Sequence, residues 1–372
     1  MSRRRRAREQ SLSLGRRLAI TGLSALATFL AALMLFALWA LWVYQGPGPQ
    51  AREGGLTSVM LRRGASLPEI ASTLERAGVV RSGSIFVAAA QITASARDLK
   101  AGEYEFASRT PMSQVLDDIR AGRVVRHQVT IPEGYTSEMA IEMLMRETVL
   151  TGSAPVPPEG AILPETYDYE RGEDRSAVLK RMMDAHDELL ASLWAKRQAG
   201  LPFKSPEEAV ILASVVEKET GLASERPRIA AVFLNRLARG MRLESDPTII
   251  YGLTKGRPLG RGIRLSELTG ETPYNTYVID GLPPTPIANP GRASLAAVLD
   301  PPKTTELFFV ADGSGGHVFA STFEEHRRNV ARWRQIERQK KAQAQAAPPT
   351  PLVGSTPLAG GEPAAPDTPG GE

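Results

Sequence analysis

Two glutamates near the end of one predicted helix, Glu217 and Glu219, are the residues of this sequence best placed for acid–base chemistry. The helix is delimited at both ends: Ser205 and Glu208 fit a capping box with a proline in the first turn, and Gly221 fits a C-terminal stop. A carboxyl group there can act as a general acid if its surroundings raise its pKa toward neutrality.

Glu219 occupies an unusual position for a surface residue. The residues three, four, seven and eight positions earlier share its helix face and are all apolar, namely Val216, Val215, Leu212 and Ile211. The last helical turn also carries the negative end of the helix dipole, which disfavours a carboxylate. Burial and dipole together should raise the pKa of Glu219. The competing interpretation is an amphipathic helix that ends in solvated charges.

Net charge argues against a nucleic-acid surface. Residues 1–17 carry seven arginines and one glutamate, a net charge of +6, whereas the whole chain of 372 residues carries +4, so the remainder sums to −2. Because the positive charge is confined to the N-terminus, no nucleic-acid partner is expected.

Residues 18–44 contain no charged side chain and are long enough to cross a bilayer with some tilt. Trp39, Trp42 and Tyr44 cluster at the far end, as in an interfacial belt. A cleavable signal peptide is the alternative, but no Ala-x-Ala site follows. We expect a single-pass protein of the cell inner membrane, with a cytoplasmic N-terminus and the remaining chain in the periplasm.

Several other chemistries lack the residues they need. The chain has no cysteine, and its four histidines show no metal-ligand spacing. No nucleophile-elbow serine and no phosphate-binding glycine loop are present. We therefore expect no metal and no cofactor.

The predicted fold class is α+β, with a single N-terminal transmembrane helix. The predicted units are a cytoplasmic Arg-rich N-terminus (1–17), the transmembrane helix (18–44), a linker (45–55), a small α/β module (56–122), a larger mixed α/β domain (123–345) and a disordered Pro/Ala/Gly-rich tail (346–372). Helices are predicted over 84–96, 137–145, 174–197, 225–239 and 322–341, and strands over 102–106, 124–131, 307–311 and 317–320. The region 241–292 shows little periodicity and is typical of binding loops.

The spacing of the two glutamates limits the reaction. Two-carboxylate glycosidases place their acids across the scissile bond, ~5–9 Å apart. Residues two apart on a helix point about 200° apart, so Glu217 and Glu219 cannot form that pair. Asp246 or Asp280 could supply a partner from the loops. Alternatively, a single carboxyl suffices if a hydroxyl of the sugar itself attacks, because the intramolecular step needs neither water nor an enzyme nucleophile.

The chain resembles the endolytic murein transglycosylase family (MltG, YceG-like). The longer matching motifs are 213–220 (Ala-Ser-Val-Val-Glu-Lys-Glu-Thr), 232–236 (Val-Phe-Leu-Asn-Arg), 240–248 (Gly-Met-Arg-Leu-Glu-Ser-Asp-Pro-Thr), 274–277 (Tyr-Asn-Thr-Tyr), 281–284 (Gly-Leu-Pro-Pro) and 287–291 (Ile-Ala-Asn-Pro-Gly). Shorter ones are 224–226, 251–252, 271–272, 309–313 and 316–317. One departure is Leu-Pro-Glu-Thr-Tyr at 163–167, where the family often has Phe-Pro-Asp-Thr-Tyr.

This resemblance implies a membrane-anchored lyase that acts on peptidoglycan. It implies that the module 56–122 is LysM-like and that residues 123–345 form the transglycosylase domain. The implied reaction cleaves MurNAc-β-1,4-GlcNAc bonds in nascent glycan strands without water, leaves 1,6-anhydroMurNAc ends and helps to terminate glycan elongation. The implied catalytic residue is Glu219.

Further motif residues are candidates for substrate binding: Glu217, Asn235, Arg236, Asp246, Thr248, Tyr274, Asn275 and Tyr277. Polar side chains can hydrogen-bond sugar hydroxyls, and tyrosine rings can stack on sugars. The structural alternative is that Asn275 and Asp246 cap turns and that Arg236 pairs with a core carboxylate. His317 is expected to be a hairpin residue.

The expected partners are peptidoglycan glycan strands, the cytoplasmic membrane and cell-wall synthases of the penicillin-binding class. Two other functions stay open. One is a two-carboxylate peptidoglycan hydrolase, and the other is a non-catalytic glycan-binding tether for the synthases.

Overall fold

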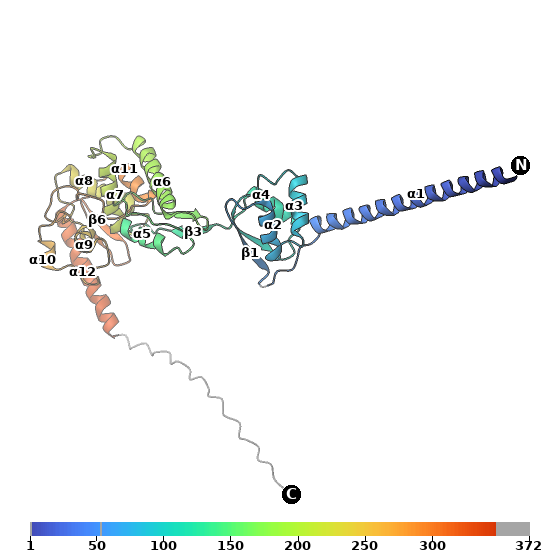
Figure 1. The fold of residues 1–372 in the computed structure, drawn as a ribbon. Coiled ribbons are helices and arrows are strands. Elements are labelled where there is room, and N and C mark those ends of the chain that lie inside the picture. The colour runs from blue at the N-terminus through green and yellow to red at the C-terminus, as the bar shows by residue number, and fades with distance from the viewer. Residues whose placement is uncertain (1, 53, 347–372) are drawn as a thin grey trace, which may run out of the picture.

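A long N-terminal helix leads into two globular bodies (Figure 1). The structure, a computed structural model, describes residues 2–52 and 54–346. Helix α1 (Ser2–Gln45) contains a 25-residue segment, Thr21–Gln45, that is long and apolar enough to cross a membrane and is almost entirely exposed. It is compatible with a single-pass anchor. The tail predicted to be disordered lies outside the described residues, apart from its first residue.

The first globular body is a small α/β unit. Its elements are β1 (Leu56–Leu61), α2 (Leu67–Arg76), α3 (Gly83–Ile92), β2 (Gly102–Ala107) and α4 (Met112–Ala121). Strands β1 and β2 pair antiparallel, with Leu56 opposite Ala107. The helices cover this pair around a core that includes Phe86 and Tyr104, and Val43 of α1 is buried in the same core.

The second body begins with two paired strands and two helices. Its elements are β3 (His127–Thr130), α5 (Ser137–Arg146), β4 (Thr166–Tyr169) and α6 (Arg175–Ala195). Strands β3 and β4 pair antiparallel, and apolar side chains of α5 and α6 pack on them.

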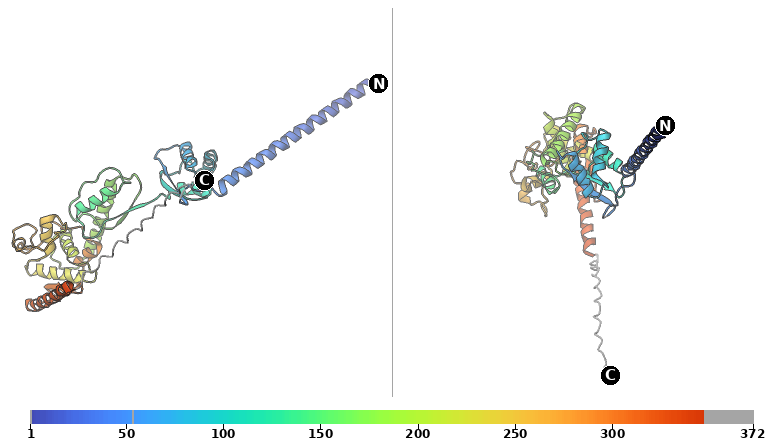
Figure 2. Two further views of the ribbon diagram at one scale, coloured as in Figure 1. Left: turned by 90° about the horizontal axis from the view of Figure 1, so that it is seen from below. Right: turned by 45° about the vertical axis from the view of Figure 1, so that its right-hand side comes forward.

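The rest of this body is mainly helical (Figure 2). Its elements are α7 (Pro206–Glu219), α8 (Arg226–Ala238), α9 (Asp246–Thr254), α10 (Leu265–Leu268), α11 (Arg292–Leu299), β5 (Phe308–Ala311), β6 (His317–Ala320) and α12 (Phe323–Ala346). Helices α7, α8 and α11 pack around fully buried residues such as Val215, Ile229 and Val298. Strands β5 and β6 form the third antiparallel pair among the described residues. The mixed α+β class is confirmed.

Helix α7 spans the predicted residues, but its ends form differently. The Ser205 side chain makes no capping bond to the helix backbone, and Glu208 accepts from the Lys204 N–H at 2.6 Å instead. At the other end Thr220 is extended, and Gly221 has no positive φ. The predicted capping box and glycine stop are therefore wrong, although the boundaries are right.

Two other predictions need correction. The region 241–292 is not wholly irregular, because it contains α9, a nine-residue helix with proline in its first turn. Such a short helix between glycine-rich segments leaves little periodicity to detect. Helix α3 is predicted to end at 96, but it ends at Ile92. Ala94, with a φ of 53°, breaks the helix.

Candidate active site

Glu219 is the last residue of α7 and faces the start of α9. The Ser245 hydroxyl, just before α9, donates a hydrogen bond to Glu219 Oε1. Burial raises the pKa of Glu219 to about 7, and the negative charge of Asp246 acts in the same direction. The Ser245 hydrogen bond and the positive charges of His317 and Arg236 oppose this rise. Glu219 is thus poised between its protonated and ionised forms near neutral pH, as the apolar helix face predicts.

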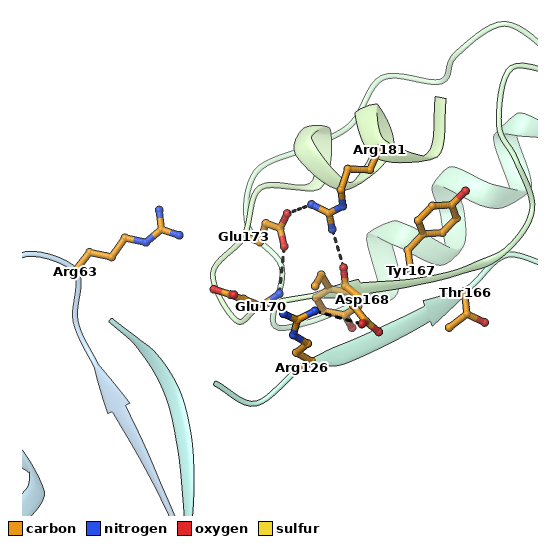
Figure 3. A pocket seen from close by; sticks show the side chains of 9 residues that line it. Arg63, Arg126, Thr166, Tyr167, Asp168, Glu170, Glu173 and Arg181 are labelled. Carbon is orange, nitrogen blue, oxygen red and sulfur yellow. Dashed lines mark hydrogen bonds and ion pairs between the residues drawn. The ribbon is translucent and has the colours of Figure 1, made fainter. Parts of the chain in front are cut away.

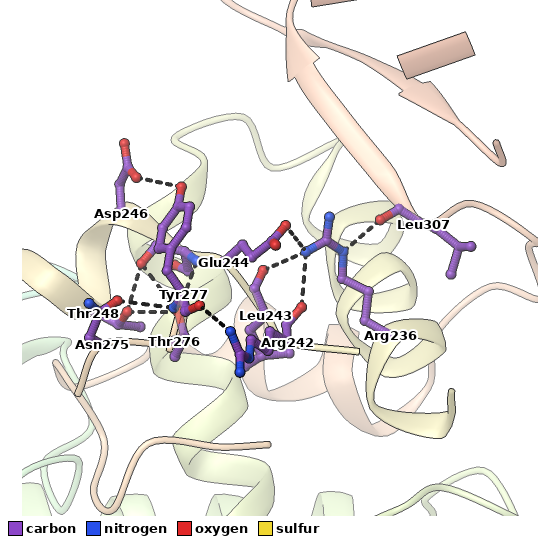
Figure 4. Close-up of polar contacts among 11 residues, drawn as sticks. Arg236, Arg242, Leu243, Glu244, Asp246, Thr248, Asn275, Thr276, Tyr277 and Leu307 are labelled. Carbon is purple, nitrogen blue, oxygen red and sulfur yellow. Dashed lines mark hydrogen bonds and ion pairs between the residues drawn. The ribbon is translucent and has the colours of Figure 1, made fainter. Parts of the chain in front are cut away.

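Asp246 and Tyr277 form a polar pair beside Glu219. The Tyr277 hydroxyl donates to Asp246 Oδ1 at 2.7 Å (Figure 4). Burial, followed by this hydrogen bond, raises the pKa of Tyr277, so the phenol stays neutral and remains a donor. Of the two loop aspartates considered as a second carboxylate, only Asp246 influences Glu219; Asp280 is 82% exposed and pairs with Arg242.

A histidine–glutamate pair lies on another side of the site. His317, at the start of β6, shares a hydrogen bond of 2.7 Å between Nδ1 and Glu225 Oε2, and its backbone N–H donates to Glu225 Oε1. Phe309 packs edge-on against the imidazole, with ring centres 5.3 Å apart. The predicted hairpin position of His317 is confirmed, and the residue also lies close enough to Glu219 to favour its ionised form.

Glu217 has a different environment from Glu219. Its Oε1 pairs with Arg226 at 3.1 Å, and its Oε2 accepts from the Gly291 N–H at 2.9 Å. Arg226 also pairs with Glu133 at 3.0 Å. A Cβ on Gly291 would lie 1.9 Å from the Glu133 carboxyl oxygen, so a larger residue there would displace the Glu133 side chain. The Glu217 side chain is 4% exposed, and both of its oxygens have protein partners.

Arg236 and Asn235 connect α8 to neighbouring loops rather than projecting into open space. Arg236 donates to the carbonyl oxygens of Leu307 at 2.7 Å and Leu243 at 3.0 Å, and to the Glu244 carboxylate (Figure 4). The Asn235 amide donates to backbone carbonyls of 304 and 306. Both side chains hold the strand β5 region against α8.

Asn275 and Thr248 are fully buried and hydrogen-bonded within the protein. The Asn275 amide donates to the carbonyl oxygen of Gly270 at 2.7 Å and also to those of 267 and 268, while its oxygen accepts from the Tyr277 N–H. The Thr248 hydroxyl bonds to the Ser245 carbonyl and to Thr276. These contacts position the loop that carries Tyr277 and the segment that carries Ser245.

Tyr274 belongs to an aromatic pair next to α9. Its ring centre lies 5.0 Å from that of Tyr251, and its hydroxyl shares a hydrogen bond with Thr285. The Lys255 ammonium lies over both rings. The Tyr274 ring is partly exposed, unlike Asn275 and Thr248.

A cavity of about 570 Å³ lies elsewhere, between the first body and the β3–β4 pair (Figure 3). Arg63 contributes from the loop after β1, whereas Arg126, Asp168 and Arg181 contribute from the second body. Arg181 is already bonded to Glu173 and to the Asp168 carbonyl. None of the predicted site residues lines this cavity.

Three residues of the site received no role from the sequence: Ser245, Glu225 and Arg226. Each lies inside a matching motif, but their partners come from distant segments. Ser245 bonds to a residue 26 positions away, and Glu225 bonds to one 92 positions away. The one local signal for a role of Ser245 is its position before Asp-Pro at a helix start. That signal predicts a helix cap rather than a hydrogen bond to a carboxylate.

Comparison with known proteins places this chain in a family. A sequence model described as the YceG-like family matches residues 59–332. The chain therefore belongs to the YceG-like family.

Named relatives agree with this assignment. The chain is 30% identical over 323 residues to the endolytic murein transglycosylase of Streptococcus pneumoniae serotype 2, covering 74% of this chain and 58% of that protein. It is 28% identical over 305 residues to the endolytic murein transglycosylase of Bacillus subtilis, covering 72% of this chain and 82% of that protein. The chain thus spans less than two thirds of the pneumococcal relative. A crystal structure of a yceG-like protein from Listeria monocytogenes is 28% identical, with a TM-score of 0.47, and the match covers 74% of this chain and 98% of that one.

Proposed function

We propose that this protein is a lytic transglycosylase of peptidoglycan and that Glu219 is its single acid–base catalyst. The observation that carries the proposal is the setting of Glu219, whose pKa is raised to about 7 and whose carboxyl accepts from Ser245. A group that titrates near the working pH can both give and take a proton within one reaction cycle.

The proposed reaction uses the Glu219 carboxyl twice, first as an acid and then as a base. Glu219 donates its proton to the glycosidic oxygen, and the bond between this oxygen and C1 of MurNAc breaks. The Glu219 carboxylate then takes the proton of the MurNAc C6 hydroxyl while that oxygen bonds to C1. The products are a GlcNAc end and a 1,6-anhydroMurNAc end, no water is consumed, and Glu219 regains its proton.

Neighbouring groups balance the two states of Glu219. Asp246, a negative charge nearby, favours the protonated form, whereas the Ser245 hydroxyl favours the carboxylate. The Tyr277 hydroxyl keeps Asp246 in place. In the proposed mechanism, the Asp246 carboxylate also stabilises the positive charge that develops at C1. Glu217 acts indirectly, by anchoring the last turn of α7.

The setting of the enzyme is part of the proposal. Helix α1 would anchor it in the cell inner membrane, with the N-terminus in the cytoplasm and both globular bodies in the periplasm. Residues 56–122 would be a LysM-like module that binds glycan, and residues 123–345 would be the catalytic domain. This arrangement would place Glu219 among nascent strands, near the penicillin-binding synthases that extend them.

The test is to digest purified glycan strands with the full-length protein and to weigh the products. Ends lighter by one water are expected. Hydrated reducing ends would mean hydrolysis, and an absence of cleavage would favour the glycan-binding tether. Glu219→Gln should strongly slow the formation of the anhydro ends.

The proximity of Asp246 to Glu219 also favours a second candidate function, the two-carboxylate hydrolase. A hydrolase needs Asp246 to activate water, so Asp246→Asn would remove hydrated ends. In the transglycosylase, the same substitution should slow the formation of anhydro ends without changing their chemistry. The product masses of this variant separate the two.

A further inference from the structure

Helix α3 is apolar on two opposite faces, although it lies at the surface. No residue from Ser82 to Ala96 carries a charge. Phe86 and Ala90 are fully buried in the core of the first body, whereas Ile92 on another face is 85% exposed. A helix that is apolar all round is normally covered by protein or by lipid.

The exposed face of α3 lies beside α1. The two helices are in contact (Figure 1) and together line an apolar cavity of about 560 Å³. Phe36, Leu41 and Tyr44 contribute from α1, and Ile85 and Ile92 are among those from α3. The apolar surface of the candidate membrane span therefore continues onto α3.

The junction between α1 and the first body is packed rather than free. Val43 is 4% exposed in the core of that body. The Arg81 guanidinium lies 5.2 Å from the Trp42 ring centre and donates to the Pro47 carbonyl at 3.1 Å. The Gly48 N–H donates to the Arg109 carbonyl. The predicted linker is thus bonded to the body it precedes, and α3 keeps a defined position against α1.

The length of α1 places α3 at the membrane surface. The 25 residues of Thr21–Gln45 extend for about 38 Å, whereas a hydrocarbon core is ~30 Å thick. The excess of roughly 8 Å corresponds to the last one to two turns. Those turns carry Trp39, Trp42 and Tyr44, residue types that settle at the bilayer interface, and they are the turns beside α3.

We propose that the exposed face of α3 docks into the interfacial layer of the bilayer that α1 crosses, with lipid acyl chains filling the groove between the two helices. This inference rests on the proposed membrane anchor. The docked helix adds an in-plane contact to the single span, so the first body cannot swing about the end of α1. The distance between the bilayer and the catalytic domain is then restricted.

The absence of cysteine makes a direct test possible. Single substitutions Leu33→Cys, Ile92→Cys and Ser192→Cys are made in the full-length chain and labelled with an environment-sensitive fluorophore. Leu33 lies within the span, Ile92 on the proposed docking face, and Ser192 is an exposed position on α6 in the second body. Each protein is reconstituted in phosphatidylcholine–phosphatidylglycerol vesicles that contain nitroxide lipids, with the quencher either shallow or deep.

The expected result is graded with depth. The Leu33 probe should be quenched most by deep nitroxides, and the Ile92 probe should shift to the blue and be quenched most by shallow ones. The Ser192 probe should show neither effect. If the Leu33 probe is quenched but the Ile92 probe is quenched no more than the Ser192 probe, the docking is refuted and the anchor stands. A blue shift at Ile92 without lipid quenching assigns the groove to protein, including a second copy, and also overturns it. An unquenched Leu33 refutes anchor and docking together.

Discussion

The last turn of α7 carries two glutamates, Glu217 and Glu219, whose surroundings differ. On one side, Glu217 is held by the Arg226 guanidinium and the Gly291 N–H. On the other side, Glu219 accepts a hydrogen bond from the neutral Ser245 hydroxyl, and the charges near it are the carboxylate of Asp246 and the cations His317 and Arg236. Both regions are largely shielded from water, yet only the first supplies a cation in direct contact.

This difference teaches what makes a buried carboxyl reactive. A buried charge with a hydrogen-bonded counterion is a structural element, because removal of either partner is costly. A buried carboxyl without a contacting cation minimises its cost by holding a proton, and that proton is available for chemistry. Both residues are glutamates of the same helical turn, so the partners that each one meets decide its role.

The largest expected effect is the loss of activity in Glu219→Gln. An amide cannot transfer the proton, so the rate of glycan cleavage should fall by roughly a hundredfold to ten-thousandfold. Product release is measured with purified glycan strands, and Glu217→Gln is the matched control. If Glu217→Gln loses the activity of folded protein while Glu219→Gln keeps it, the roles assigned to the two sides are reversed.

Stability should respond in the opposite order. Glu217→Gln leaves Arg226 with only its more exposed partner, Glu133, so the free energy of unfolding should fall by about 3 kcal/mol. Chemical denaturation at neutral pH measures this difference. Glu219→Gln should not destabilise the protein under the same conditions, and an equal loss in both variants would remove the distinction.

The pH dependence of stability provides a third comparison. The folded-state pKa of Glu219 is about 7 against an ordinary value of 4.5, so the folded protein binds the extra proton between these values. Stability from this group is present below pH 4.5 and is lost as the pH rises through 7. The loss should amount to roughly 2 kcal/mol, after allowance for the partial exposure of the group. Glu219→Gln should lack this decline, and parallel curves for the two proteins would contradict the raised pKa.

The smallest effect is expected from Ser245→Ala. The Ser245 hydrogen bond favours the carboxylate, so its removal should raise the pKa of Glu219 further. The alkaline limb of the activity profile should then move up by less than about one pH unit. Ser266→Ala, at an exposed serine, is the control and should leave the profile unchanged. A downward movement in Ser245→Ala would contradict the direction of the hydrogen bond's effect.

Much of the fold could be predicted from local pattern. The apolar face of α7, the strands around Tyr104 and the β5–β6 hairpin follow from periodicity and turn residues, and each is present. Helix ends were less predictable. Ser205 and Gly221 match end signals by type, but Glu208 bonds to the Lys204 N–H and the backbone is already extended at Thr220, because several local arrangements of similar energy compete there.

The candidate site also has features that local pattern predicts and features that it does not. The face of α7 already indicates that Glu219 is buried among apolar residues, because helix geometry alone places its neighbours. The bonds of Glu217 to Arg226 and to the Gly291 N–H could not be predicted, because both partners lie outside α7. The buried state of Asn275 and the bonding of Arg236 to Leu307, 71 positions away, also could not be read locally.

The sequence by itself determined the apolar N-terminal helix, the α+β class and the choice of Glu219 as the candidate acid, because each depends on residues within a few turns of one another. Only the tertiary structure decided which polar motif residues are bonded internally and which neighbouring groups modify the pKa of Glu219. Those outcomes depend on contacts between segments tens of residues apart, whose meeting follows from packing of the whole core and not from any local pattern.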